Sequence, residues 1–168
     1  MVMDRLRRLV RHLCMTPWRV KRAFPTQVLY IIEAKVKQAE QSHCGQIRVV
    51  IEGALPAELL WRNLSARARA IDVFSLLRVW DTEHNNGVLL YLLLADHDVE
   101  IVADRGIAAR VAQQDWEAIC REMESAFQLG EFEAGITAGI QAVAAKLAVH
   151  FPRRETGRNE LPDEPIML

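Results

Sequence analysis

Cysteine is scarce in this sequence, and its scarcity excludes several classes of small protein. The three cysteines, Cys14, Cys44 and Cys120, are far apart, odd in number and form no Cys-x-x-Cys pair. Neither a disulfide framework nor a cysteine-bound zinc ion is therefore expected. Cysteine usage of this kind suits a reducing compartment, and we expect the chain to be cytoplasmic.

Long apolar runs and a large net charge are also missing. No stretch reaches the roughly 18 continuous apolar residues of a membrane span, and the first residues lack the apolar core of a signal peptide. The formal net charge of −1 predicts no general attraction to nucleic acid. With 168 residues, 51% of them hydrophobic, the chain is long enough to bury the core of one domain.

Familiar catalytic motifs are absent as well. There is no Gly-x-Ser-x-Gly elbow, no P-loop and no Gly-x-Gly-x-x-Gly fingerprint. His43 stands next to Cys44, but adjacent residues rarely aim at each other, so this is not a candidate catalytic pair. The sequence therefore favours a non-catalytic protein.

Residues 1–23 are strongly basic, which the near-neutral total conceals. Against Asp4 the segment has the basic residues Arg5, Arg7, Arg8, Arg11, Arg19, Lys21 and Arg22. An amphipathic helix that prefers anionic lipid could use the apolar side chains Leu6, Leu9, Val10, Leu13 and Trp18. The alternative is a solvated arm or a helix docked on the domain. The first interpretation predicts peripheral contact with the inner membrane through residues 1–23.

The compact part, residues 24–152, alternates helix and strand patterns. Apolar spacing predicts helices from Thr26 to about Ser42, after Pro56, from Asp115, and over about 132–150. Apolar or β-branched runs predict strands over 46–52, 88–94 and 99–104. The crossover between the first two strands predicts that they are parallel, and the short turn before the third predicts an antiparallel hairpin.

The last segment, residues 153–168, is polar, contains prolines and has no periodicity. We expect it to be flexible or to lie along the surface. Its terminal "PIML" is a candidate docking peptide.

Acidic residues between Trp80 and Gly106 fall into two groups at opposite ends of the predicted sheet. Asp81, Glu83, the pair Asn85–Asn86 and Asp104 belong to one end, and the "ADHD" turn belongs to the other. Oxygen ligands of the first kind suit calcium or magnesium. The alternative is ordinary turn chemistry, since Asn86-Gly87 and Asp104 before Gly106 are typical of corners.

The order of local patterns resembles the TPM domain family. A glycine before "QIRVVI", a long helix ending in Trp, "NNGVLLYLLL", "DVEIVADRGI" and "FQLGEFEAGITAGI" carry the resemblance, which covers about residues 26–151. That family includes thylakoid-lumen acid-phosphatase-like proteins and photosystem II repair proteins. The resemblance implies an α/β fold, a three-layer α/β/α sandwich with a small central mixed β-sheet.

The resemblance also implies partners and a site. Short bacterial members look like companions of membrane-attached TPM proteins and of LemA-type proteins. Some members bind calcium, and plant members are credited with acid phosphatase activity. Asn85 and Gln113 stand where the family often has an aspartate, so the candidate metal ligands that remain are Asp81, Asp104 and Asp115. Because affinity follows the number of carboxylates, we expect weak or absent binding of calcium or magnesium.

Three functions follow from these patterns. The leading one is a non-catalytic interaction domain that assists membrane or envelope proteins. The alternatives are a divalent-metal-dependent phosphatase, which would use the end with Asp81, Asp104 and Asp115, and a calcium-binding module.

Overall fold

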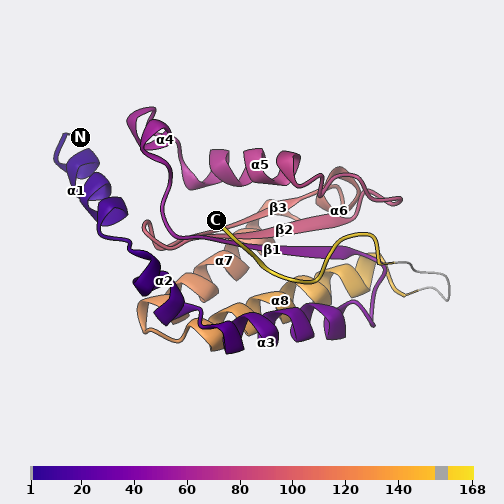
Figure 1. Cartoon of the computed structure of the whole chain (residues 1–168). Helices are drawn as coiled ribbons and strands as arrows, with labels where there is room; N and C mark the ends of the chain where they lie inside the picture. The colour runs from indigo at the N-terminus through magenta and orange to yellow at the C-terminus, as the bar shows by residue number, and fades with distance from the viewer. Residues whose placement is uncertain (1, 154–158) are drawn as a thin grey trace.

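A four-stranded mixed sheet forms the centre of the computed structural model, which describes residues 2–153 and 159–168 (Figure 1). Its strand order is β3-β2-β1-β4. β1 (Gln46–Glu52) and β2 (Gly87–Leu93) are parallel and buried at every position, as their apolar runs predict. β3 (Asp98–Ala103) pairs antiparallel with β2, so the predicted parallel pair and hairpin are confirmed.

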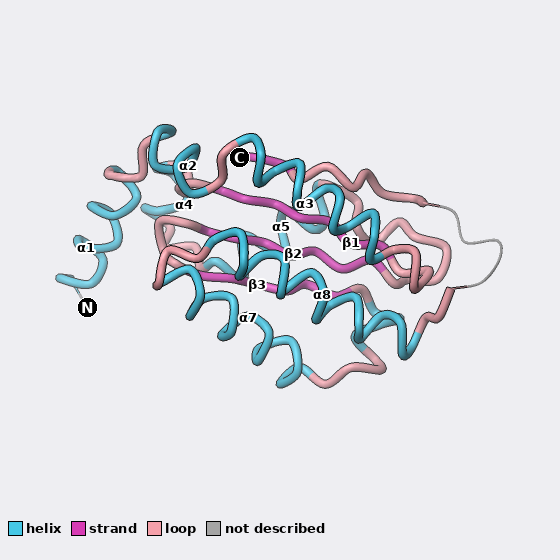
Figure 2. The backbone as a smooth tube through the Cα atoms, turned by 90° about the horizontal axis from the view of Figure 1, so that it is seen from below, coloured by secondary structure: helices cyan, strands magenta, loops and turns pink. Residues whose placement is uncertain are grey.

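Helices cover both faces of the sheet (Figures 1 and 2). On one face lie α3 (Thr26–Ala39), α7 (Gln113–Gln128) and α8 (Phe132–His150), which contribute to the larger core. The other face carries α4 (Ala57–Trp61) and α5 (Ala66–Leu76), which close a smaller core with Tyr91 at its centre. The α/β fold and its three layers therefore agree with the prediction.

Two glycines let α8 approach α7 closely. A Cβ atom on Gly135 would lie 2.7 Å from the Phe127 ring, and one on Gly139 would lie 2.2 Å from the Met123 sulfur. α8 is also long and apolar enough to cross a membrane, by length and composition alone. Its apolar side, however, lies in the core, with Ile136, Ile140 and Leu147 fully buried.

The single long helix predicted after Pro56 is wrong. The chain leaves the helical path after α4, where Asn63 has a positive φ of 52°. Ser65 then begins α5 as its N-cap, because its hydroxyl accepts a hydrogen bond from the Ala68 amide. The buried side of α5 is consequently Ala66, Ala70 and Val73, whereas Ile71 is exposed.

The C-terminal tail joins the sheet. β4 (Ile166–Met167) pairs parallel with the free edge of β1, Val50 facing Ile166. A fourth strand was not predicted, and the described part of the tail, 159–168, is held against β1. The division of the chain at residues 23 and 152 stays a prediction.

The basic N-terminal segment forms two helices, α1 (Val2–Leu13) and α2 (Pro17–Ala23). Thr16 caps α2 with its hydroxyl, and Pro17 occupies the first helical position, where a missing N–H costs nothing. α1 extends beyond the end of the sheet that carries the β2–β3 turn (Figure 1).

Candidate functional site

At one end of the sheet, β3 turns into the short helix α6 (Arg105–Ala108). Asp104 caps this helix, since its Oδ1 accepts a hydrogen bond from the Arg105 amide at 2.7 Å. The Asp104 amide donates to the Gly87 carbonyl at 2.9 Å, which joins the corner to the start of β2. The corner of Thr82, Asn85, Asn86, Asp104 and Arg105 is called the Asp104 corner below.

Asn86 is fully buried in the Asp104 corner. Its amide group donates to the Cys44 carbonyl at 3.0 Å, and its backbone N–H donates to the Thr82 hydroxyl at 3.1 Å. Two buried oxygens nevertheless have no hydrogen-bond partner within the described chain: Asn86 Oδ1 and Asp104 Oδ2. Buried polar atoms usually have partners, so these two oxygens are the candidate ligand atoms of the Asp104 corner.

Asn85, in the loop before β2, pairs with a cationic side chain. The Arg105 Nε donates to Asn85 Oδ1 at 3.0 Å. The backbone here is tight, because a Cβ on Gly106 would lie 2.5 Å from the Asn85 carbonyl oxygen and 2.6 Å from that of His84. Glycine at 106 is thus needed for the corner to close.

The three predicted metal ligands do not form a cluster. Asp81 is exposed in the loop before β2, and Asp115 lies in the first turn of α7, with its Oδ2 3.3 Å from Lys146 Nζ. Across residues 2–153 and 159–168, no group of three or more His, Cys, Asp or Glu side chains is placed to hold a metal ion. The corner therefore fits a hard cation only in part, through one carboxylate and one amide, and the metal site stays a prediction.

His43 and Cys44 point to different partners. The His43 Nδ1 lies 3.0 Å from the Gly45 carbonyl, while the Cys44 thiol donates to the Phe151 carbonyl at 3.6 Å. Burial lowers the pKa of His43 to about 4, so its ring is neutral at physiological pH. These contacts are structural, and neither side chain touches the other as a base would touch a nucleophile.

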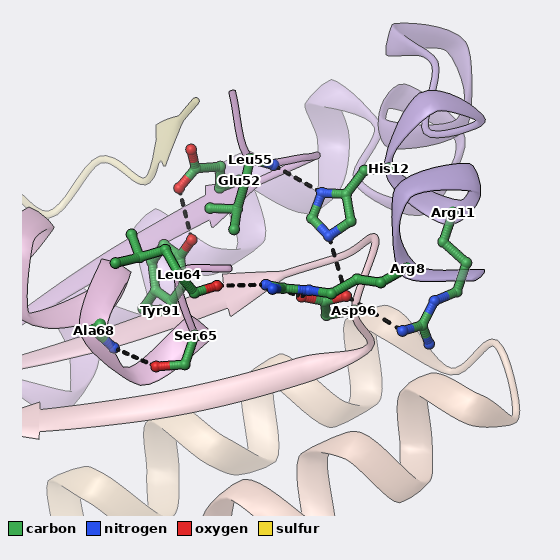
Figure 3. A network of polar contacts seen from close by, with 10 residues as sticks. All are labelled: Arg8, Arg11, His12, Glu52, Leu55, Leu64, Ser65, Ala68, Tyr91 and Asp96. Atoms are coloured by element: carbon green, nitrogen blue, oxygen red, sulfur yellow. Dashed lines mark hydrogen bonds and ion pairs between the residues drawn. The ribbon is translucent and has the colours of Figure 1, made fainter. Parts of the chain in front are cut away.

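A second polar cluster lies at the opposite end of the sheet, in the turn between β2 and β3 (Figure 3). Asp96 Oδ2 accepts hydrogen bonds from Arg8 at 2.8 Å, and Asp96 Oδ1 lies 3.1 Å from His12 Nε2 and 3.4 Å from Arg11. Arg8 also donates to the Leu64 carbonyl at 2.7 Å. These contacts, called the Asp96 anchor below, attach α1 to the domain.

The tautomer of His12 follows from its neighbours. The Leu55 amide donates to His12 Nδ1 at 3.0 Å, so the proton is on Nε2, facing Asp96. Burial would raise the pKa of Asp96, but hydrogen bonds from Arg8 and His12 outweigh it and hold that pKa below its usual value. Asp96 is therefore ionised and paired with cations of α1 at neutral pH.

The Asp96 anchor was not predicted from the sequence, which only places the "ADHD" turn at the opposite end of the sheet from Asp104. The sequence does show that two residues which bind Asp96, Arg8 and His12, are four residues apart and therefore share one side of α1. The turn's acid lies 88 residues from Arg8, which no local pattern connects.

Glu52 is buried at the end of β1. Both its oxygens bind Arg69, at 2.9 and 3.0 Å, and Oε2 also accepts a hydrogen bond from the Tyr91 hydroxyl at 2.6 Å. Burial and the neighbouring Glu52 raise the pKa of Tyr91. This fully paired cluster ties α5 to the sheet and leaves no free carboxylate there.

The anchored α1 exposes an apolar side to solvent. Its exposed apolar residues follow helical spacing along one side: Met3 (69% exposed), Leu6 (59%), Val10 (50%) and Leu13 (71%). Trp18 on α2 and Trp61 on α4 are also exposed, and Leu6, Leu9 and Trp61 line a shallow pocket of about 280 Å³ between α1 and α4. Among the basic side chains of α1 and α2, those of Arg5, Arg7, Arg19, Lys21 and Arg22 are also exposed.

Comparison with known proteins agrees with the fold. The family model of the TPM domain matches residues 25–146. The NMR structure of the BA42 protein from the psychrophilic bacterium Bizionia argentinensis is 28% identical, with a TM-score of 0.74, covering 84% of this chain and 93% of that one.

A second solved structure shows the fold alone. The N-terminal domain of a protein from P. gingivalis is 18% identical, with a TM-score of 0.61, covering 79% of this chain and 83% of that one. No protein with a curated description matches. Because the family model spans most of the sequence, from α3 into α8, the chain belongs to the TPM domain family.

Proposed function

We propose that this TPM domain is a non-catalytic interaction domain that assists membrane or envelope proteins at the inner face of the membrane. The carrying observation is α1, which is fixed to the domain by one side and presents an apolar side flanked by arginines on the other. A helix of this kind lies in the interface of an anionic bilayer. The partner we propose is a membrane-attached TPM or LemA-type protein.

The charge pattern supports a surface contact. Arg8 and Arg11 bind Asp96, whereas Arg5, Arg7 and Arg22 are exposed. Basic residues near an anionic surface contribute about 1 kcal/mol each, so three of them add roughly 3 kcal/mol to the apolar term. Exposed Trp18 has the ring type that gathers at the boundary between headgroups and acyl chains.

Vesicle co-sedimentation tests this proposal. The full chain should sediment with vesicles of phosphatidylglycerol and phosphatidylethanolamine, and binding should fall steeply between 50 and 300 mM salt, about one order of magnitude or more. Leu6→Glu combined with Val10→Glu should abolish binding, because both carboxylates would enter the apolar side of α1.

The matched control carries the same charge change elsewhere. Leu76 and Leu129 are as exposed as the apolar residues of α1. The double variant Leu76→Glu with Leu129→Glu adds the same two charges away from α1, so its binding to vesicles should stay within twofold of that of the parent chain. Equal sedimentation of both double variants, or none of the parent chain at 50 mM salt, would refute membrane contact through α1.

A calcium-binding module is the second candidate, and the two unpartnered oxygens of the Asp104 corner favour it. Asp104 Oδ2 and Asn86 Oδ1 are both of the hard type that calcium prefers. With a single carboxylate we expect a dissociation constant no tighter than about 1 mM.

Thermal unfolding in the presence of calcium tests whether the Asp104 corner binds the ion. At 10 mM calcium, ten times that constant, the linked stabilisation is about 1.4 kcal/mol, and Asp104→Asn should remove it while Asp81→Asn should not. No shift in melting temperature for the parent chain, with magnesium as the comparison ion, would exclude the module.

A further inference from the structure

The C-terminal tail is held against β1 mainly through its backbone. Gln46 Oε1 accepts hydrogen bonds from the amides of Glu160 and Leu161, at 2.7 and 2.9 Å. The Arg48 guanidinium donates to the carbonyls of Pro162 and Glu164, the latter at 2.7 Å. With the tail in place Gln46 and Arg48 are almost fully buried, at 3% and 8% exposure, so the tail covers the side chains that bind it.

Direct strand pairing continues the same contact. The Leu168 amide donates to the Ile51 carbonyl at 2.9 Å, and the Gly53 amide donates to the Leu168 carbonyl at 3.2 Å. Leu161 and Ile166 pack against the smaller core beside α5. When an extended segment adds to a free sheet edge in this way, its main-chain hydrogen bonds supply the affinity. The contacts of its alternate side chains supply the specificity.

The groove also has a charge preference. Burial lowers the pKa of Arg48, and the negative charges of Glu164 and Asp163 act in the opposite direction. A buried guanidinium without nearby acids would be costly, so the groove favours an acidic segment.

The tail is nonetheless a weakly held occupant. Its regular pairing is limited to Ile166 and Met167, and Met167 and Leu168 are 37% and 52% exposed. The short strand pairing and the exposed end lower the cost of exchanging the tail for another segment.

We propose that the β1 edge is a strand-binding groove whose ligand is an extended, acidic, proline-containing segment of a partner protein, and that the chain's own tail fills the groove until that partner binds. The ligand repeats the pattern of the tail: an apolar residue for the Leu161 position, acids opposite Arg48, and a β-branched residue for the Ile166 position. This inference rests on the proposed role as an interaction domain, but it does not depend on membrane contact.

Binding of a labelled tail peptide, NELPDEPIML, to the full chain tests the groove. Leu161→Asp with Ile166→Asp should release the tail, because both side chains would bring a charge against the smaller core. By fluorescence anisotropy, the released variant should bind the peptide at least tenfold more tightly than the parent chain. Adding Arg48→Met to that variant should abolish binding, and a peptide with the same two Asp substitutions should not bind.

Several outcomes would overturn the proposal. A released variant that keeps the far-UV circular dichroism of the parent but does not bind the peptide refutes the groove, as does binding that survives Arg48→Met. A stable dimer of the parent chain at micromolar concentration, lost in the released variant, assigns the groove to a second copy and refutes the partner assignment.

A second measurement covers the case in which the released variant does not fold. Millimolar unlabelled peptide added to the parent chain should speed hydrogen exchange at the Leu161 and Leu168 amides at least tenfold, with Leu90 in β2 unchanged. Unchanged exchange at both tail amides refutes the proposal. Since no vesicle is present, failure here leaves the membrane test unaffected.

Discussion

Asp96→Asn should detach α1 without unfolding the domain. The Asp96 side chain is 10% exposed and that of Arg8 17% exposed, so their contact is screened far less than a surface pair. A hydrogen bond to a charged group contributes about 1.5–3 kcal/mol, whereas the half-exposed Arg11 contributes at most about 1 kcal/mol. Because an asparagine oxygen still accepts one hydrogen bond, we expect a net loss of about 2 kcal/mol, or about 30-fold in the opening equilibrium of α1.

Native-state hydrogen exchange measures that loss at a defined amide. Leu55 N–H donates to His12 Nδ1, so its exchange reports detachment of α1 directly. Its rate should rise about 30-fold in Asp96→Asn, while the Leu90 amide in the buried β2 strand should not change. The control is Asp72→Asn, the same substitution at an exposed site on α5. Equal Leu55 exchange in both variants would refute the anchor.

Other substitutions test the remaining clusters. Burial raises the pKa of Glu40 from 4.5 to about 8, so the folded chain prefers the neutral carboxyl group. The free energy of unfolding is therefore highest below pH 4.5 and falls as the pH rises toward 8. Glu40→Gln should flatten that fall and stabilise the chain by about 2 kcal/mol at pH 8 in urea unfolding, and an unchanged pH profile would contradict this. Gly87→Ala should cost about 3 kcal/mol in the same assay, because its Cβ would lie 2.0 Å from the Val79 carbonyl oxygen, and a loss under 1 kcal/mol would be inconsistent with that contact. Tyr91→Phe should lower the free energy of unfolding by about 1–2 kcal/mol, since the hydroxyl that binds Glu52 is lost, and a neutral effect would show that Arg69 alone suffices.

Elements with a strong local pattern were predictable from the sequence. β1 and β2 are continuous apolar runs buried on both faces, and α8 repeats its apolar residues with helical spacing, so their existence and order follow from local periodicity. The break between α4 and α5 was missed because the apolar spacing continues through it, although Ser65 is a good N-cap. β4 could not be predicted, since its two residues pair with Val50 and Ile51, more than a hundred positions away in the chain.

The candidate sites also divide into features that a local pattern predicts and features that depend on distant residues. Asp104 as a helix cap follows from its position before Gly106 at the end of a strand, and the structure has that cap. The Asp96 anchor depends on where α1 docks, and long-range ion pairs leave no periodic signal in the sequence. For the same reason, spacing alone could not show that Lys146 on α8 binds Asp115.

The Asp96 anchor and the Asp104 corner occupy opposite ends of the β2–β3 hairpin. With about 3.3 Å per residue along a strand, the seven residues of β2 separate them by roughly 20 Å. A molecule attached to a bilayer through α1 would therefore act as a rigid spacer that holds the Asp104 corner away from the lipid. A soluble ion or a second protein could then reach that corner from the aqueous side without competing with the surface for room.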